Sequence, residues 1–316
     1  MRALLLFCLL LVAAPAVAQY PSRPVKIVVT IPPGGAPDIA ARILAERLSP
    51  ALGQPVVVEN RPGANGNTAA AEVARAAPDG YTLILAADSL IAINPHLYSK
   101  MPIDTLKDLA PVASLVSNQF VLSVNPSLPV KSFQEFIEYA KKAKPPLAYA
   151  SGGNGSQHQL TMEMLKARAG FSMVHVPYRG GAPATTATVA GEVAAMFAGT
   201  STAPQIRAGR LRALAVAGAK RSFAFPDLPT IGEFYPGFEN SIWLGLFGPA
   251  ALPDEVLAKL RTEITKVLQD PGVKEKLHGA GSLEPFVTAP EEFAALIRRD
   301  YDKYGKLIRQ IGIKAD

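Results

Sequence analysis

One serine of this chain stands where hydrolases place a nucleophile. The segment Gly199–Ala203 (GTSTA) follows an apolar run and precedes a proline, so Ser201 would lie on a turn between a strand and a helix. Hydrolases of the α/β type expose their serine on such a turn. Ala203 replaces the second glycine of that pattern, and only His278, at the end of an ordinary helical pattern, could close a Ser–Asp–His order. A secreted serine esterase using Ser201 is therefore an alternative, whereas hydroxyl donation to a bound carboxylate is the favoured use of Thr200 and Ser201.

The histidines and the cysteine do not indicate metal or thiol chemistry. The chain has four histidines and one cysteine, without the spacing of a metal site. Cys8 falls within the first 18 residues. His175 lies in an alternating strand pattern and is expected to be half-buried and hydrogen-bonded, whereas His158 follows a glycine turn and could face a ligand. We expect no catalytic residue, no metal and no cofactor.

Glycine-rich turns are the other candidate binding elements. An apolar strand, a turn of glycine, proline and small residues, and an alanine-rich helix follow one another in residues 25–48 and again in residues 56–77. A helix that starts on such a turn offers free backbone N–H groups and the positive end of its dipole, which suit an anion. A nucleotide cradle is disfavoured, because His158 occupies the third glycine position of a Gly-x-Gly-x-x-Gly pattern starting at Gly153. The repeated arrangement of strand, small-residue turn and helix predicts a protein that binds a small acid.

The elements that must position these turns alternate along most of the chain. Strand-like runs alternate with helical patterns, which indicates an α/β architecture with largely parallel sheets. Strands are expected at 25–31, 56–59, 82–86, 112–116, 120–124, 147–150, 173–176, 193–198, 213–217 and 243–247, and helices at 39–48, 69–77, 132–143, 157–169, 254–268 and 290–311. Six small-residue turns follow strand ends, three before residue 95 and three after residue 150. Because ligands of open sheets bind beyond the carboxyl ends of strands, we expect two facing lobes with a ligand between them.

The first 18 residues have the features of a cleaved signal peptide. Arg2 is followed by the apolar run Ala3–Val12 and by Ala16–Ala18, a small-x-small cleavage pattern. The apolar run is shorter than the ~20 residues of a membrane span, although an N-terminal anchor is the alternative interpretation. Removal leaves 298 of the 316 residues and lowers the net charge from +6 to +5. The basic residues are dispersed and no nucleic-acid motif is present, so we expect an exported protein without a nucleic-acid partner.

Short motifs over essentially the whole mature chain, specific only in combination, resemble one receptor family. They are Tyr20–Pro24 (YPSRP), Pro33–Gly35 with Asp38 and Ala41–Arg42, Leu52–Ala64 (LGQPVVVENRPGA), Pro78–Leu83 (PDGYTL), Asn94–Tyr98 (NPHLY), Val176–Gly180 (VPYRG), Ala208–Val216 (AGRLRALAV) and Leu228–Thr230 (LPT). The chain resembles Bug-type receptors, the periplasmic substrate-binding components of tripartite tricarboxylate transporters. The resemblance implies a two-lobed, type II-like periplasmic binding protein, each lobe a mainly parallel sheet flanked by helices.

The resemblance also implies lobe boundaries and partners. Residues 1–18 would be the signal peptide, 19–121 with 242–316 the first lobe, and 122–241 the second. The protein would be a monomer in the periplasm, not an enzyme, and would pass its ligand to membrane transporter subunits. The ligand would be a di-, tri- or aromatic carboxylate or an amine-bearing acid. An adaptor that presents the ligand to a sensor kinase would use the same fold and cleft.

The predicted ligand contacts are carried over from the family turn by turn. The first lobe would supply Gly34, Gly35, Ala36 and Asp38, then Asn65, Gly66, Asn67 and Thr68, then Ala87, Asp88 and Ser89. The second lobe would supply Gly153, Asn154, Gly155, Ser156, Gln157 and His158, then Tyr178, Gly180 and Gly181, then Thr200 and Ser201. The chain departs from many relatives in having Asn65 where they have a glycine, and in lacking an aspartate at Ala194 or Ala195. Asp38 could contact the ligand or only complement its helix dipole; if Asp38 and Asp88 both face the cleft, an amine-bearing or neutral ligand becomes more plausible.

Overall fold

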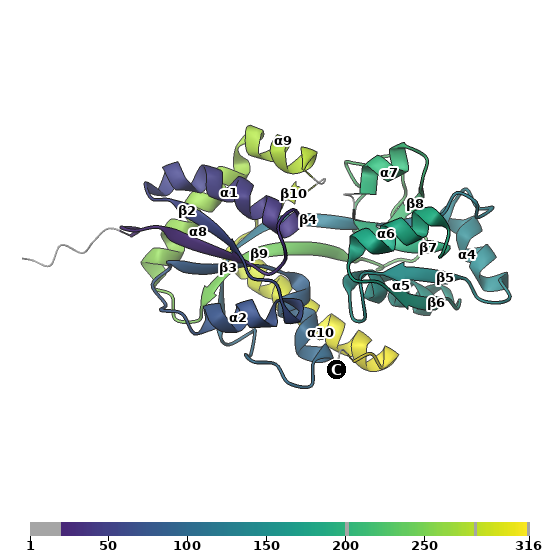
Figure 1. Cartoon of the computed structure of the whole chain (residues 1–316), viewed down its shortest axis with the longest axis horizontal. Coiled ribbons are helices and arrows are strands. Elements are labelled where there is room, and N and C mark those ends of the chain that lie inside the picture. The colour runs from purple at the N-terminus through teal and green to yellow at the C-terminus, as the bar shows by residue number, and fades with distance from the viewer. Residues whose placement is uncertain (1–19, 200–201, 281–282, 315–316) are drawn as a thin grey trace, which may run out of the picture.

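The protein folds into two groups of strands and helices that are connected by two long strands. The structure, a computed structural model, describes residues 20–199, 202–280 and 283–314. Figure 1 shows β1, β2, β3, α1, α2 and α8 on one side, α4 to α7 on the other, and β4 and β9 running between them. The strand order is β2-β1-β3-β9-β4-β7-β5-β6, with β8 and β10 paired to β4.

The strands of the first group surround β9. They are β1 (Val25–Val29), β2 (Val56–Asn60), β3 (Thr82–Ala87), β9 (Ser241–Pro249), the first part of β4 (Leu109–Val124) and β10 (Glu284–Pro285). β1 is parallel to β2 and β3, whereas β9 is antiparallel to β3 and β4. Helices α1 (Ala36–Leu52), α8 (Asp254–Gln269) and α9 (Pro271–Gly279) cover one face. After β2 come the 3-10 turn Ala64–Gly66 and α2 (Asn67–Ala74). After β3 come the π-helical turn η2 (Ser89–Ile93) and α3 (Asn94–Leu97), and after β10 comes α10 (Pro290–Ile311).

The second group is built on the last residues of β4. It contains β5 (Ala148–Ser151), β6 (Val174–Pro177), β7 (Ala195–Gly199) and β8 (Arg212–Val216). β5 is parallel to β6 and β7, whereas β4 is antiparallel to β7 and β8. The helices are α4 (Phe133–Lys142), α5 (Gln157–Ala169), α6 (Gly181–Ala190) and α7 (Ala203–Arg207), with a 3-10 turn at Ile231–Glu233.

Alternating side chains give each sheet a core on both faces. In β3, Leu83 and Leu85 pack with α1 and α8, whereas Ile84 and Ala86 pack with α2 and α10. This alternation is the period of two that an extended strand imposes. A separate cluster around Phe120, Phe136 and Phe197 fills the second group between its sheet, α4 and α5.

The α/β class is confirmed, but two of the expected features of the sheets are corrected. The runs at 112–116 and 120–124 are one strand, β4, because the polar residues between them pair with β9. The sheets are mixed rather than mainly parallel: the outer strands of each group are parallel, and the connecting strands run antiparallel to them. Within the described residues, no helix has both the length and the apolar character needed to cross a membrane.

Candidate functional site

A cavity of about 350 Å³ lies where turns from both strand groups meet. It is at the small end of the ~300–1,000 Å³ typical of small-molecule sites. Its walls are the turns after β1, β2, β3, β5 and β6, together with Leu283 from the segment after α9, and its floor is formed by β4 and β9. The lining residues are Ile31, Ala36, Pro37, Asn65, Ala87, Asp88, Ser89, Val116, Ser117, Asn118, Phe120, Gly152, Gly155, Ser156, Gln157, His158, Gly180, Gly181, Ile242, Leu244 and Leu283.

Two helices from opposite strand groups begin at this cavity without a side-chain cap. Helix α1 has Gly35 as its N-cap and α6 has Gly180, and neither N-cap makes a side-chain hydrogen bond. Ala36 and Gly181, the first residues of these helices, line the cavity. Helix α5 also starts there, but the Ser156 hydroxyl caps it by accepting from the Gln159 N–H. The cavity therefore receives the positive ends of helix dipoles from both groups.

The structure brings about half of the predicted contacts to the cavity. The predicted residues that line it are Ala36, Asn65, Ala87, Asp88, Ser89, Gly155, Ser156, Gln157, His158, Gly180 and Gly181. Those described but not lining it are Gly34, Gly35, Asp38, Gly66, Asn67, Thr68, Gly153, Asn154 and Tyr178. Thr200 and Ser201 lie outside the described residues.

The carboxylate of Asp38 forms hydrogen bonds and an ion pair with residues of its own strand group. Its carboxylate accepts from the Gly34 N–H at 2.9 Å, from Asn60 Nδ2 at 2.8 Å and from the guanidinium of Arg42 at 2.9 Å. Only 2% of Asp38 is exposed. Hydrogen bonds from Arg42, opposed by burial, lower the pKa of the Asp38 carboxyl to about 2. The geometry thus gives Asp38 the role of fixing the turn before α1, which presents Ala36 to the cavity.

The asparagines of the second turn bind Asn94. Asn94 Nδ2 donates to the Asn65 carbonyl at 3.0 Å and to Asn67 Oδ1 at 2.8 Å, while Asn65 Nδ2 donates to Asn94 Oδ1. Gly66 has a φ of 91°, and a Cβ there would lie 3.1 Å from Thr30. The turn therefore packs against the strand group, and Asn65 alone of its predicted contacts reaches the cavity.

Other predicted contacts in the second group stabilise their own loops. The Gly153 N–H donates to Ser151 Oγ at 3.1 Å, and the Gly153 carbonyl accepts from the same hydroxyl. Asn154 is exposed, and the Tyr178 hydroxyl donates to Glu192 at 3.2 Å. These residues shape the turns after β5 and β6 without lining the cavity.

Asp88 is the acid that reaches the cavity wall, but it is fully buried and belongs to a polar cluster. Its Oδ1 accepts from the Ser89 N–H at 2.8 Å, and its Oδ2 accepts from Gln157 Nε2 in the other strand group. Burial, reinforced by the negative charge of Asp300, raises the pKa of the Asp88 carboxyl well above its ordinary value. The charged form of Asp88 is therefore less favourable than that of an exposed aspartate.

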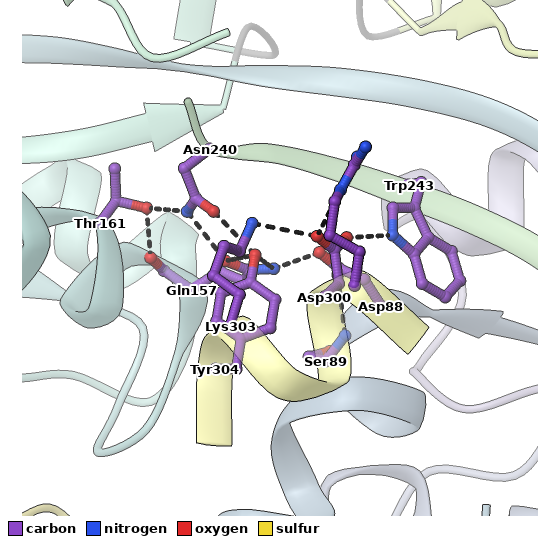
Figure 2. Close-up of polar contacts among 10 residues, drawn as sticks. Asp88, Ser89, Gln157, Thr161, Asn240, Trp243, Asp300, Lys303 and Tyr304 are labelled. Carbon is purple, nitrogen blue, oxygen red and sulfur yellow. Dashed lines mark hydrogen bonds and ion pairs between the residues drawn. The ribbon is translucent and has the colours of Figure 1, made fainter. Parts of the chain in front are cut away.

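Gln157 connects Asp88 to helix α10 and to the residue before β9. Gln157 Nε2 also donates to the Tyr304 hydroxyl at 3.1 Å, and Gln157 Oε1 accepts from Asn240 Nδ2 at 3.1 Å. Tyr304 donates to Asn240 Oδ1 at 2.7 Å, which closes the ring shown in Figure 2. Beside this cluster, Asp300 accepts from Trp243 Nε1 and pairs with Lys303. Both strand groups and α10 are therefore joined by hydrogen bonds next to the cavity.

His158 is wedged between two glycine turns. A Cβ at Gly152 would lie 3.1 Å from its Nδ1, and a Cβ at Gly181 would lie 3.2 Å from its Nε2. Its ring packs on Phe120, and the buried Nδ1 atom has no hydrogen-bond partner among the described residues. Burial lowers the pKa of the His158 imidazole to about 4, so the ring is neutral at neutral pH.

His175 fits the expectation of a satisfied side chain. Its Nε2 lies 2.6 Å from Ser151 Oγ and its Nδ1 lies 3.1 Å from Gln159 Nε2. His278 pairs instead with Glu284 at 2.8 Å and stacks on Phe223. In the described ranges, no group of three or more His, Cys, Asp or Glu side chains could hold a metal ion.

Several lining residues were not predicted. They are Ile31, Pro37, Val116, Ser117, Asn118, Phe120, Gly152, Ile242, Leu244 and Leu283. Most are apolar residues of β4 and β9 or next to the predicted turns. The signal that could have found the floor was the polar run 117–119 between two apolar strands, since it marks one strand passing between the groups.

Comparisons with known proteins agree on one family. A family model described as "Tripartite tricarboxylate transporter family receptor" matches residues 40–313. Protein BugT of Bordetella pertussis is 35% identical over 307 residues, which is 96% of this chain and 94% of that protein. A solved structure described as R. palustris Rpa4515 with adipate has a TM-score of 0.84 and 34% identity, covering 93% of this chain and 99% of that one. MatC from Rhodopseudomonas palustris with bound malate has a TM-score of 0.78 and 31% identity, covering 92% of this chain and 100% of that one.

Proposed function

Because the chain belongs to the tripartite tricarboxylate transporter receptor family, a family of periplasmic solute-binding proteins, we propose that it captures a small carboxylic acid and delivers it to a membrane transporter of that type. The observation that carries this proposal is the cavity that receives uncapped N-termini of α1 and α6 from opposite strand groups. Two similar structures hold adipate and malate, both of which are carboxylates.

The available interactions are sufficient for useful affinity only if the site is already ordered. A partly buried helix end contributes up to ~2 kcal/mol, and a hydrogen bond to a charged group contributes ~1.5–3 kcal/mol. Micromolar binding requires ~8 kcal/mol net. Two helix ends with a few such bonds reach this value when ordering costs are small. The partners of Asp38 and Gln157 hold the turns after β1 and β5 in place, which supports that condition.

We propose that the lobes divide as residues 19–121 with 242–316, and 122–241. The pairing of β4 supports this division, since its residues up to Gln119 pair with β9 and those from Phe120 pair with β7. We also propose that residues 1–18 are a cleaved signal peptide. A mature N-terminus at Gln19, read by sequencing the exported protein, tests that cleavage.

Calorimetry on the purified protein tests the receptor proposal. The panel contains aliphatic, aromatic and amine-bearing acids, and mass spectrometry under native conditions identifies any acid retained from the cell. Saturable binding of at least one acid in the micromolar range or tighter supports the proposal. Folded protein that binds none of them, and that retains no small molecule, contradicts it.

Two alternative functions, a sensor-kinase adaptor and a serine esterase, are tested by separate experiments. Loss of uptake on deletion of the membrane subunits indicates transport, whereas unchanged uptake with loss of an acid-induced transcriptional response indicates a sensor-kinase adaptor. Fluorophosphonate labelling that disappears in Ser201→Ala would indicate an esterase.

A further inference from the structure

The start of α6 and the side chain of His158 meet at one wall of the cavity. Helix α6 begins on Gly180 without a side-chain cap, which leaves its first N–H groups available to a bound group. A Cβ added to Gly181, the first residue of α6, would lie 3.2 Å from His158 Nε2. Gly180, Gly181 and His158 all line the cavity. A ring nitrogen and an uncapped helix end therefore lie side by side in the second strand group.

The other nitrogen of the imidazole is enclosed by the protein. His158 Nδ1 is buried and has no hydrogen-bond partner among the described residues. It lies 3.1 Å from the position that a Cβ on Gly152 would take. The ring packs on Phe120, with 5.0 Å between the two ring centroids. Of the two ring nitrogens, Nε2 is thus the one that borders the start of α6, and Nδ1 is the one that the protein covers.

The position of the ring proton follows from this difference. Burial lowers the pKa of the His158 imidazole to about 4, so the ring carries a single N–H group at neutral pH. A proton on Nδ1 would bury a donor that has no partner in the protein, and buried donors without a partner are rarer in proteins than buried acceptors. A proton on Nε2 instead places the N–H group beside the free N–H groups of α6. The start of α6 then offers donors from both the backbone and a side chain.

These positions give His158 a specific role in the proposed function, on which this inference rests. We propose that His158 donates a hydrogen bond from Nε2 to the ligand carboxylate that binds at the first N–H groups of α6. The described part of the lining contains no lysine or arginine, so uncharged donors of this kind must stabilise the carboxylate. The other polar groups of Ser89, Ser117 and Asn118 line the cavity from η2 and β4, where they can bind other parts of the ligand.

Two amide side chains of different length test which ring nitrogen acts. The amide nitrogen of glutamine reaches the position of a histidine Nε2, whereas that of asparagine reaches only as far as Nδ1. The probe in calorimetry is the acid of the panel that the wild-type protein binds most tightly. His158→Phe and His158→Asn should each weaken its binding at least ~10-fold, because a hydrogen bond to a charged group is lost. His158→Gln should retain most of the affinity.

The control makes the same change at a histidine outside the lining. His96 donates from Nε2 to the Tyr301 carbonyl and does not line the cavity, so His96→Asn should leave the affinity unchanged. Melting temperatures show which variants fold. Unchanged affinity in folded His158→Phe, or equal affinities in His158→Gln and His158→Asn, overturns the inference and leaves the receptor proposal standing. If the wild-type protein binds no acid of the panel, both proposals are overturned.

Nitrogen NMR on the wild-type protein with ¹⁵N-labelled histidine locates the ring proton directly. The signals missing from the spectrum of His158→Gln are those of His158. In the complex with the same acid, Nε2 should carry the proton, and its signal should shift as the acid is added. A proton on Nδ1 in the complex, or an Nε2 signal that saturating acid does not move, overturns the inference.

Discussion

Replacing the Asp38 carboxylate by an amide should destabilise the protein, although Asp38 does not line the cavity. Asp38→Asn keeps the volume of the side chain but removes the charge that Arg42 and the Gly34 N–H stabilise. The pKa of the carboxyl falls from 3.8 to about 2 on folding, a shift worth ~2.4 kcal/mol at ~1.36 kcal/mol per unit. Because half of Arg42 is exposed, solvent screening reduces this to ~1–2 kcal/mol. The amide N–H₂ also faces a donor, which adds ~1 kcal/mol and gives ~2–3 kcal/mol in total.

The pH dependence separates the charge from the other effects of Asp38→Asn. A carboxyl with a lowered folded pKa contributes stability above its unfolded pKa near 3.8, and this contribution is lost as the pH falls through about 2. Urea unfolding of both proteins should therefore show a difference of ~2–3 kcal/mol at pH 7 that narrows between pH 4 and pH 2. The control is Glu138→Gln, which removes an exposed partner of Lys141 and should cost less than ~0.5 kcal/mol. Equal stability of Asp38→Asn and wild type at pH 7, or a gap that stays constant down to pH 2, would refute the reasoning.

Three further perturbations probe the cavity wall. The melting temperature should fall as the pH drops from 6.5 toward 4, because burial lowers the pKa of His158 to about 4 and protonation therefore favours the unfolded chain. His158→Phe should make the melting temperature depend less on pH over this range. Gln157→Ala should lower the free energy of unfolding in urea by ~2–4 kcal/mol, since it leaves several buried polar groups unpaired, whereas the exposed Gln310→Ala should change it by less than ~0.5 kcal/mol. Gly155→Ala should cost more than Gly170→Ala in the same assay, because both glycines have φ near 70° but only a Cβ at Gly155 meets the side chain of Leu97.

Each of these expectations has a contrary result. A melting temperature that falls equally in wild type and His158→Phe would exclude the imidazole as the titrating group. Gln157→Ala with the stability of Gln310→Ala would show that the buried polar cluster adds nothing to stability. Equal losses in the two glycine variants would show that the approach to Leu97 is not tight.

The sequence was informative where structure follows from local pattern. The turns after β1, β3, β5 and β6 were predicted from glycine and small residues at the ends of apolar runs, and each contributes lining residues. At α1 and α6 the chemistry is local, because a helix that starts on glycine leaves its first N–H groups without a side-chain cap wherever it occurs. The α/β class followed from the same alternation of patterns.

The features that the sequence did not predict depend on contacts between residues that lie far apart in the chain. Asp38 is satisfied by Asn60, and Gln157 by Tyr304, which lies 147 residues further on. No local pattern predicts such partners, so the sequence alone leaves Asp38 as a candidate ligand contact. The polar run 117–119 resembled a break between strands because its pairing partner, β9, is more than 120 residues away. Because this pairing with β9 cannot be read from the local sequence, the floor of the cavity could not be predicted either.

The position of β9 has a consequence for biogenesis. This strand fills the space between β3 and β4, yet the ribosome makes it only after every strand of the second group. The edge of β3 in the newly made polypeptide therefore stays without its native partner until β9 has been synthesised, after all the strands of the second group. A product that ends before residue 241 would keep that edge unpaired, so truncated forms should bind chaperones and be degraded by proteases more readily than the full chain.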